Sequence, residues 1–497
     1  MKKNSSLLAI FIFILLIVVS CAVNPVTGKK QLSFMSEEQE KAMGLESDPA
    51  VIAQFGVYPN DTLQKFIQSE GDAMVKVSHR PDLKFTFRLL DANVINAFAV
   101  PGGYVYFTRE IMAYFNNEAQ FAGVLGHEIG HITARHSAQQ YTKQMITQVA
   151  LVGGMIFSEK LRNMGEQAMQ GMQLLFLKFS RDDETQADNL GVQYSSLVGY
   201  DAVEMAKFFK TLERVSGGGE GDRLPTFMST HPDPGDRYVK VTDLAKKWQA
   251  TNNASNLKVN RNQYLKMIDG IVYGDDPRQG YLDKTSNIFY QPEMKFQFPI
   301  TKGWQYQNSP SQVQMGSEDG KAMMTLSLSS KKTLKEAADE VISAYQLKLL
   351  SQGSSQKING LNAYHFIAQY GEQQQSQQQQ QGQEAAQILT VHTTLIEYNS
   401  NIYIFLGLSD SKDYNAYKSN FTYTTNGFKQ LTDVSKMNVL PERVKVITVN
   451  NTSSLSQVLS QHNIASNRYE ELAILNGMET TTQIPAGTLI KIIEKRK

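Results

Sequence analysis

The chain contains almost no cysteine, since Cys21 is the single one among 497 residues. No disulfide can form within the chain. Beyond residue 21 there is no thiol for a cysteine protease, a cysteine-based zinc site or a thiol redox enzyme. Any metal must therefore be held by histidine and carboxylate side chains.

An excess of charge of either sign is also missing. The chain has 49 basic and 48 acidic residues, a net charge of +1 and a pI near 7.7. Such a balance creates no long-range field that attracts nucleic acid, and we expect no nucleic-acid ligand. Hydrophobic residues make up 41% of the sequence, which is enough to bury proper cores, and the length suggests about three domains.

The N-terminus has the layout of a secretory signal peptide. Lys2 and Lys3 precede an unbroken apolar run over residues 7–19. This run of 13 residues is shorter than the roughly 20 needed to cross a bilayer as a helix. We interpret residues 1–20 as a signal peptide, and the alternative is an uncleaved anchor helix extending to Val23.

The end of this segment, Val18-Val19-Ser20-Cys21, resembles a bacterial lipobox. The resemblance implies that Cys21 is lipidated and becomes the first residue of a lipoprotein facing the periplasm. Ala22 follows where an aspartate would imply retention in the inner membrane, so the outer membrane is favoured. Residues 21–60 are polar and mixed, and we expect a lipidated tether that leads into helices.

Composition changes divide the rest of the chain, and we expect a multidomain α+β protein. Residues 61–250 are mainly helical in pattern, and Asn- and Gly-containing residues 251–284 indicate a connector. Residues 285–430 mix strand and helix patterns and include a glutamine-rich surface loop at 373–383. Residues 436–497 predict the order strand, helix, helix, strand.

The chemistry is concentrated in Gly126-His127-Glu128-Ile129-Gly130-His131. Asn117 is a plausible N-cap with Gln120 three residues later, which predicts a helix from about residue 118. Residues i and i+4 share a helix face, so His127 and His131 can bind one metal ion. Glu128 lies beside them as a general base rather than a ligand, although the motif alone can arise by chance.

A catalytic zinc usually needs a third protein ligand. His136 follows His127 by nine residues instead of the ten of a metzincin, and Ala134 stands where a turn needs glycine, so we expect the helix to continue and His136 to support the ligands. Glu184 is the better ligand, because it shares a helix face with Asp188, which can orient a ligand histidine. The alternative is a solvated acidic face.

These motifs together resemble the HtpX- and BepA-like membrane-associated zinc metallopeptidases, a family that includes the CaaX prenyl proteases. The resemblance extends over about residues 24–245 and rests on Asn24-Pro25-Val26-Thr27-Gly28, Asn96-Ala97-Phe98-Ala99-Val100-Pro101-Gly102-Gly103, the His-Glu-Ile-Gly-His helix, Ser180-Arg181 to Asp188, and Thr230-His231-Pro232. It implies a mainly helical gluzincin domain that binds one zinc ion per chain, with Glu184 as the third ligand. Asp188, His136 and Arg181 are expected around the ligands.

Other positions are expected to serve catalysis and substrate binding. His231 is a candidate oxyanion donor or a fourth ligand that closes the site, and the alternative is a capping or core histidine. The strand around Tyr104, Val105 and Tyr106 is expected to pair with an extended substrate backbone. Asn96 is a further candidate for holding the peptide.

The remaining regions bear on targeting. Residues 285–430 weakly resemble PsbP-like α/β folds. Residues 436–497 resemble a LysM module through Glu471 to Met478 and Ile484 to Ile492. LysM modules bind N-acetylglucosamine polymers, so contact with peptidoglycan is implied.

Three functions are compatible with these features. The first is an envelope quality-control endopeptidase acting on unfolded or misassembled outer-membrane proteins. The second is a chaperone or assembly factor whose active site is normally closed, and the third is a peptidoglycan-binding scaffold. The intact metal motif favours the first.

Overall fold

The computed structural model describes residues 21–33, 35–141, 179–217, 227, 231, 234–370 and 388–496. The expected signal peptide over residues 1–20 and the glutamine-rich loop 373–383 lie outside this part of the chain. Among the described residues, no helix is both long enough and apolar enough to cross a membrane.

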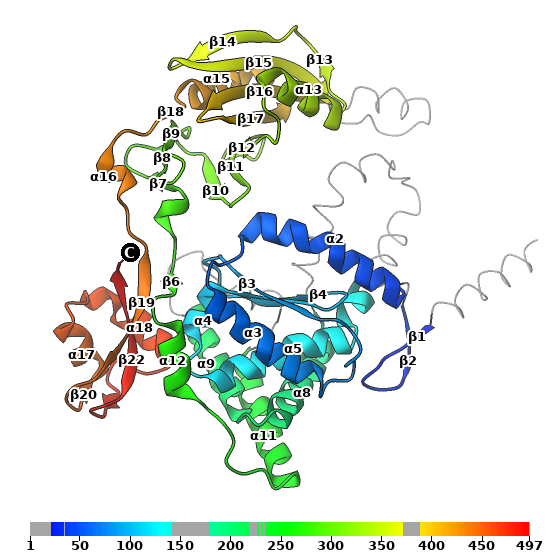
Figure 1. Ribbon diagram of the computed structural model, residues 1–497, viewed down its shortest axis with the longest axis vertical. Coiled ribbons are helices and arrows are strands. Elements are labelled where there is room, and N and C mark those ends of the chain that lie inside the picture. Colours follow the sequence, from blue (N-terminus) through cyan, green and yellow to red (C-terminus); the bar gives the residue numbers. More distant parts are fainter. Residues whose placement is uncertain are drawn as a thin grey trace, which may run out of the picture. The chain divides into compact units, whose positions relative to one another are not determined.

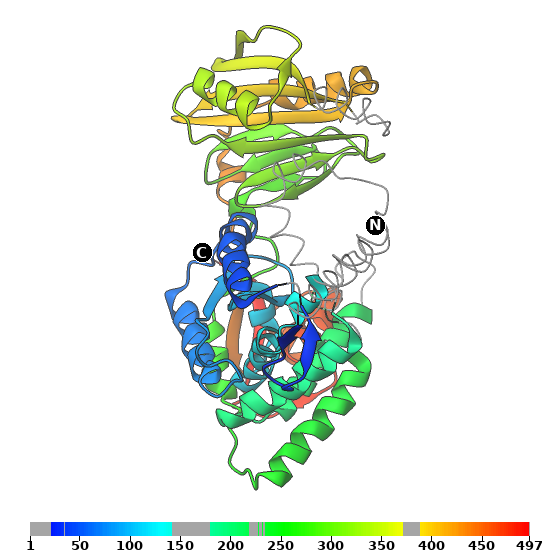
Figure 2. The ribbon, with the colours of Figure 1, turned by 90° about the vertical axis from the view of Figure 1, so that its right-hand side faces the viewer.

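Contacts between residues divide the chain into two compact units. The first unit comprises residues up to Asp275 together with Glu442–Arg496, and the second comprises Asp276–Pro441. Figure 1 labels the helices and strands, and Figure 2 shows the same ribbon turned by 90°.

A three-stranded sheet lies near the start of the first unit. Its order is β3 (Thr86–Leu90), β5 (Tyr104–Thr108) and β4 (Ala97–Val100), with β3 parallel and β4 antiparallel to β5. Side chains of successive strand residues point to opposite faces. The sheet therefore contributes to two different cores.

Two helices before the sheet pack on these opposite faces. α2 (Glu37–Phe55) contributes Val51 to a small core with Phe98 and Tyr106. α3 (Asp61–Val75) packs with Phe87 into the main core, which also contains the later helices. Figure 1 shows the sheet between α2 on one side and α3 on the other.

The later helices of the first unit are α4 (Arg109–Tyr114), α5 (Glu118–Thr133), α8 (Arg181–Leu197), α9 (Val203–Gly217), α11 (Pro234–Thr251) and α12 (Arg261–Ile268). Small residues let α5 and α8 pack closely. A Cβ on Gly126 would lie 3.0 Å from the carbonyl oxygen of Gly191, and one on Gly191 would lie 3.1 Å from the backbone nitrogen of His127. This close packing brings the motif-bearing faces of the two helices together.

The N-terminal segment that we expected to be a tether is folded against the first unit. β1 (Cys21–Val23) pairs with β2 (Lys30–Leu32), and α2 begins at a capping box formed by Ser36 and Gln39. Asn24 is buried, and its side-chain amide donates to the carbonyl oxygen of Ala134 at the end of α5 (3.1 Å). Few residues therefore separate Cys21 from the core.

The expected connector 251–284 contributes α12 and β6 (Val272–Tyr273) to the first unit. β6 is the edge of a sheet of order β22-β19-β6, in which β19 (Glu442–Thr448) and β22 (Leu489–Lys495) come from the C-terminal segment. Chain segments far apart in sequence thus share one sheet.

The C-terminal segment has the expected strand–helix–helix–strand order, with α17 (Leu455–Gln461) and α18 (Tyr469–Leu475) between β19 and β22, and a small pairing of β20 (Ser453–Ser454) with β21 (Gln483–Ile484). It is tied to the helical part of the same unit. The ammonium group of the fully buried Lys491 donates to the carbonyl oxygens of Ala113 (2.7 Å) and Phe115 (3.0 Å). Its apolar residues belong to the same core as α5.

The second unit is antiparallel β-sheet with helices. Its eight-stranded sheet contains β10 (Gln305–Asn308), β11 (Gln312–Gly316), β12 (Ala322–Leu328), β13 (Lys348–Leu349), β14 (Ser354–Ile358), β15 (Leu361–Tyr370), β16 (Leu389–Tyr398) and β17 (Asn401–Asp410). A four-stranded sheet contains β7 (Tyr281–Asp283), β8 (Ile288–Gln291), β9 (Phe296–Pro299) and β18 (Lys429–Gln430). β16 and β17 form a hairpin, and Asn399 and Ser400 form its turn with positive φ.

The second unit also contains the helices α13 (Leu334–Ala344), α15 (Tyr414–Asn426) and α16 (Val434–Met437). Val341 of α13 and Phe421 of α15 lie in different cores, and β16 contributes to both cores through Leu395 and Ile396. The large sheet is therefore covered on both faces.

Our expectation that the helix continues past Ala134 is wrong. α5 ends at Thr133, Arg135 adopts a φ of 60°, and helical backbone resumes at residues 136–141. The Arg135 side chain bonds Glu40 (2.6 Å) and the carbonyl oxygen of Met35 (2.8 Å), and these contacts hold the break in place.

Candidate metal centre

α5 positions the first half of the site. Its N-cap is Asn117, whose side chain accepts from the backbone N–H of Gln120, as the sequence predicted. His127, Glu128 and His131 are all fully buried. The helix thus places two imidazoles and a carboxylate in the interior.

α8 positions the second half. Ser180 and Asp183 form the capping box that begins this helix, and Glu184 and Asp188 follow one turn apart. Both carboxylates are almost fully buried, at 2% and 4% exposure. The acidic face of α8 therefore points into the core rather than into solvent.

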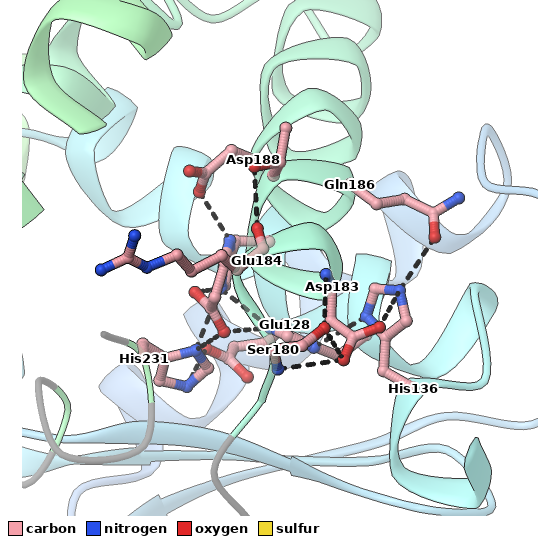
Figure 3. Close-up of polar contacts among 12 residues, drawn as sticks. Glu128, His136, Ser180, Asp183, Glu184, Gln186, Asp188 and His231 are labelled. Carbon is pink, nitrogen blue, oxygen red and sulfur yellow. Dashed lines mark hydrogen bonds and ion pairs between the residues drawn. The ribbon is translucent and has the colours of Figure 1, made fainter. Parts of the chain in front are cut away.

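Four side chains converge between these helices. One ligand atom from each of His127, His131, Glu184 and His231 lies within 4.8 Å of the others. The Nε2 atoms of His127 and His131 are 3.0 Å apart, and each is 3.5 Å from a Glu184 oxygen. His231 Nδ1 lies 2.8 Å from Glu184 Oε1, and Figure 3 shows this contact. These distances suit one small cation between the four groups.

Glu128 lies next to this cluster without joining it. Neither carboxylate oxygen has a hydrogen-bond partner among the described residues, and Oε1 lies 3.7 Å from His231 Nε2. Burial raises the pKa of Glu128. An unsatisfied buried carboxylate is costly, which indicates a group positioned for a ligand or a water.

Two side chains support the ligand histidines. Asp188 Oδ1 lies 3.0 Å from His127 Nδ1, and His136 Nδ1 lies 3.0 Å from His131 Nδ1. His136 is held in turn by Gln186 (2.9 Å). Each of the two thus lies within hydrogen-bonding distance of one candidate ligand histidine.

The guanidinium of Arg237, which the sequence did not indicate, lies beside the carboxylates of Glu184 and Asp188. Arg237 of α11 is 5% exposed and forms a bidentate pair with Asp188 (2.5 and 2.9 Å). Its Nη1 lies 3.1 Å from Glu184 Oε2. Arg181, which we had expected in a supporting role, lies exposed at the first residue of α8. Arg237 thus supplies the cation near the ligands.

The electrostatics of the site favour the protonation states that a metal needs. Burial lowers the pKa of His131 well below its usual value, with positive charge on neighbouring histidines acting in the same direction. Burial opposes ionisation of Asp188, but Arg237 and His127 lower its pKa to about 2. For Glu184, His231 and Arg237 likewise outweigh burial and lower the pKa. Neutral imidazole and ionised carboxylate are the forms that bind metal.

The donor set fits a zinc ion. Two imidazole nitrogens and one carboxylate are a common set for catalytic zinc, which keeps a further position open. His231 lies close enough to fill that position or to act beside it. Burial opposes protonation of His231, but Glu184 and Glu128 outweigh it and raise the pKa. A protonated His231 can donate to a negatively charged oxygen.

Our expectation that residues 104–106 pair with substrate is wrong. β5 is the central strand, with β3 on one side and β4 on the other, and the buried Tyr106 hydroxyl donates to Asp48 (2.9 Å). In the described part of the chain, the edge nearer α5 is β4. A substrate strand can add only at an edge.

Among the described residues, no strand pairs with the side of β4 that faces away from β5. The carbonyl oxygen of Asn96 accepts from the backbone N–H of Thr108 on β5. Because hydrogen bonding alternates along an antiparallel pair, the backbone N–H and carbonyl groups of Ala97 and Ala99 point away from β5. The carbonyl oxygen of Ile95 points the same way and accepts from the backbone N–H of Phe227 (3.3 Å). Asn96 itself is buried, and its Oδ1 has no partner among the described residues.

Sequence comparisons relate the first unit to known peptidases. Residues 61–245 match Peptidase family M48. The chain is 30% identical over 232 residues to the beta-barrel assembly-enhancing protease of Escherichia coli, covering 44% of this chain and 47% of that protein. It is 27% identical over 201 residues to the mitochondrial metalloendopeptidase OMA1 of Arabidopsis thaliana, covering 39% of each. The matched part of the chain spans about half the length of the bacterial relatives.

Among solved structures, the chain resembles CyanoP, the cyanobacterial PsbP of Synechocystis sp. PCC 6803. The sequence identity is 15% and the TM-score is 0.21, and the alignment covers 31% of this chain and 91% of the other.

Proposed function

We propose that the protein is a zinc-dependent endopeptidase. The observation that carries this proposal is the convergence of His127, His131 and Glu184 on one buried point, beside the unpaired carboxylate of Glu128. The match of residues 61–245 to Peptidase family M48 supports it. One zinc ion would be held by the two imidazoles and Glu184.

The side chains around this point divide the work of peptide hydrolysis. When bound, zinc supplies a Lewis acid that activates water and polarises a carbonyl. Glu128 accepts a proton from the attacking water and returns it to the departing amine. Its raised pKa suits both roles at neutral pH, because burial makes the carboxylate a stronger base. Asp188 and His136 hold the ligand histidines in orientation.

The substrate is expected to bind in extended form along β4. Ala97 and Ala99 direct backbone groups to the side of β4 that no described strand pairs with, which is the arrangement that recognises a peptide backbone. Backbone pairing tolerates many side chains. We therefore expect broad specificity for unfolded segments, with Asn96 holding the peptide through its unpaired amide oxygen.

The position of His231 also supports a second function. His231 Nδ1 lies 3.3 Å from His127 Nε2 and 2.8 Å from Glu184, so it can occupy the place of the water. A site closed in this way would give a chaperone or assembly factor with little proteolysis. The same histidine acts as an oxyanion donor if it moves aside during catalysis.

The setting of the protein is part of the proposal. The signal peptide and the lipobox ending at Cys21 support a lipoprotein that faces the periplasm, on the outer membrane rather than the inner one. The relatives named for β-barrel assembly support unfolded or misassembled envelope proteins as substrates. The LysM resemblance of residues 436–497 supports contact with peptidoglycan.

Cleavage of one substrate in two states tests this function. The chain without residues 1–20, called the mature chain below, should cleave a urea-unfolded outer-membrane β-barrel protein and leave its detergent-folded form intact. Chelation should stop cleavage, and zinc should restore it. Equal cleavage of both forms would contradict recognition of extended backbone. If no cleavage occurs but aggregation of the unfolded protein is suppressed, and His231→Ala restores cleavage, the closed-site function is correct.

A further inference from the structure

Arg237 lies at the centre of the contacts that surround the candidate ligands. We propose that Arg237 is a positioning residue for the metal centre, acting on His127 through Asp188 and directly on Glu184. The proposal deepens the proposed function and rests on it, because it assigns the residue that prepares the site for a divalent cation.

The contact with Asp188 is the first step of the argument. Arg237 Nη2 and Nε donate to the two oxygens of Asp188 at 2.5 and 2.9 Å, which fixes the plane of the carboxylate. Asp188 Oδ1 can then accept from His127 Nδ1 at 3.0 Å. A carboxylate in this position fixes the tautomer of the histidine and leaves Nε2 free for the metal. Arg237 thus orients His127 through Asp188, and its Nη2 also lies 3.4 Å from His127 Nδ1.

The contact with Glu184 is the second step. Arg237 Nη1 lies 3.1 Å from Glu184 Oε2, while Glu184 Oε1 faces His231 Nδ1 at 2.8 Å. Both oxygens of Glu184 face the cluster, because Oε2 also lies 3.5 Å from His127 Nε2, and the guanidinium holds Oε2 from the other direction. This arrangement limits the rotation of Glu184.

Charge balance is the third step. Glu128, Glu184 and Asp188 are three buried carboxylates that face the site, and Arg237 offsets one of them. A divalent cation would balance the negative charge of the other two carboxylates when the histidines are neutral. Without Arg237, the buried carboxylates of Asp188 and Glu184 lose the cation beside them, which is costly in a buried region.

A purely structural role is the competing explanation. The Arg237 guanidinium also stacks on Phe209 of α9 at 4.1 Å, so it holds α11 and α9 together whether or not a metal is bound. A structural role predicts loss of stability in the metal-free protein. A positioning role predicts loss of zinc affinity that depends on Asp188.

Zinc affinity in a double-mutant cycle separates the two roles. In the mature chain, the zinc Kd is measured by competition with a chromophoric chelator for wild type, Arg237→Met, Asp188→Asn and the double variant. We expect each single change to weaken zinc binding by about 10- to 100-fold. The double variant should bind about as weakly as the weaker single variant, because both changes remove one chain of contacts.

Arg88→Met is the matched control. Arg88 forms a bidentate pair with Asp48 (2.6 and 2.5 Å) in the same unit, away from the ligands. This change should lower the thermal unfolding midpoint of the metal-free protein and leave the zinc Kd unchanged. Arg237→Lys keeps the charge without the bidentate geometry, so its Kd should lie between those of wild type and Arg237→Met.

Each other outcome is decisive. Wild-type zinc affinity in Arg237→Met would overturn the proposal, and a lowered unfolding midpoint with unchanged affinity would establish the structural role. Effects that multiply in the double variant would show that Arg237 does not act through Asp188. If Arg237→Met does not fold, wild-type affinity in Arg237→Lys together with a Co²⁺ absorption spectrum identical to wild type would overturn the proposal. Absence of zinc from the wild-type protein would contradict the proposed function itself.

Discussion

Glu40 joins α2 to the end of the helix that carries the His-Glu-Ile-Gly-His motif, and its removal should loosen this end. Glu40 is 2% exposed and accepts from Arg80 (3.1 Å) and Arg135 (2.6 Å), whose side chains are 8% and 9% exposed. Arg135 follows α5 directly and has a φ of 60°. Glu40→Ala removes the carboxylate that Arg135 contacts and leaves Arg80 with the more exposed Glu37, at 3.5 Å.

The size of this effect follows from the burial of the network. Breaking a buried ion pair by removing one partner typically costs about 3–5 kcal/mol. Arg80 keeps the carbonyl oxygen of Ile132 and Arg135 keeps that of Met35, so we expect about 3 kcal/mol. For a unit of this size, about 2 °C per kcal/mol converts this to a fall of about 6 °C in the unfolding midpoint.

Differential scanning calorimetry of the mature chain measures this effect, with Glu38→Ala as the control. Glu38 lies on the same helix and is exposed, so its removal should change the midpoint by less than about 1 °C. The reasoning is refuted if Glu40→Ala lowers the midpoint of the first unit no more than Glu38→Ala does.

Three further predictions concern other parts of the first unit. Asn24→Ala removes the amide that donates to Ala134 at the end of α5 and should cost about 1–2 kcal/mol of unfolding free energy in urea titration. Asn24→Asp keeps the acceptor for the N–H groups of Val26 and Thr27 but sets a carboxylate oxygen against the Ala134 carbonyl oxygen, so it should cost at least as much. Burial lowers the pKa of Lys491 well below 10.5, so the unfolded chain binds more protons just below pH 10.5. The unfolding free energy should therefore rise with pH just below pH 10.5, and Lys491 contributes at most about 1.4 kcal/mol per pH unit to this rise. The rise should be smaller in Lys491→Met. Equal slopes in the two proteins would contradict this prediction. A model peptide substrate can be N-methylated at every second residue in two ways, so that the methyl groups replace the N–H groups facing β4 or those facing away from it. The first pattern should raise KM at least tenfold and the second should change KM little. Equal effects of the two patterns would exclude pairing of the substrate along β4.

The local parts of the site were predictable from sequence because short-range rules govern them. Asn117 caps α5, and the i, i+4 spacing places His127 and His131 on one face. The same spacing identified Glu184 and Asp188 on α8 as a pair that faces inward. Helix caps and helix periodicity depend only on neighbouring residues.

Other features depend on tertiary structure and left no local signal. Arg237 lies on a third helix and meets Asp188 only after the chain has folded, and a single arginine on an amphipathic helix usually points to solvent. The order β3-β5-β4 cannot be read from strand patterns, so the sequence alone favours β5 for pairing with substrate, although β5 is the central strand. Lys491 was not recognised because lysine is almost never fully buried.

The N-terminal and C-terminal segments show how packing overrides composition. Residues 21–60 have the polar composition of a tether, but Asn24 and Glu40 are buried against the end of α5. The C-terminal segment completes a sheet with β6 and shares the core of the helical region. Hydrogen bonds to distant backbone groups, which composition does not reveal, hold both segments in place.

The central claim is that His127, His131 and Glu184 hold a catalytic zinc that works with Glu128. The most direct test combines metal content by mass spectrometry with cleavage of unfolded β-casein, for the mature chain and its Glu128→Gln variant. We expect one zinc per chain in both proteins and cleavage by the parent alone, because Glu128 faces the ligand cluster without belonging to it. Absence of bound metal from the parent, or casein cleavage by Glu128→Gln at the parent rate, would contradict the account.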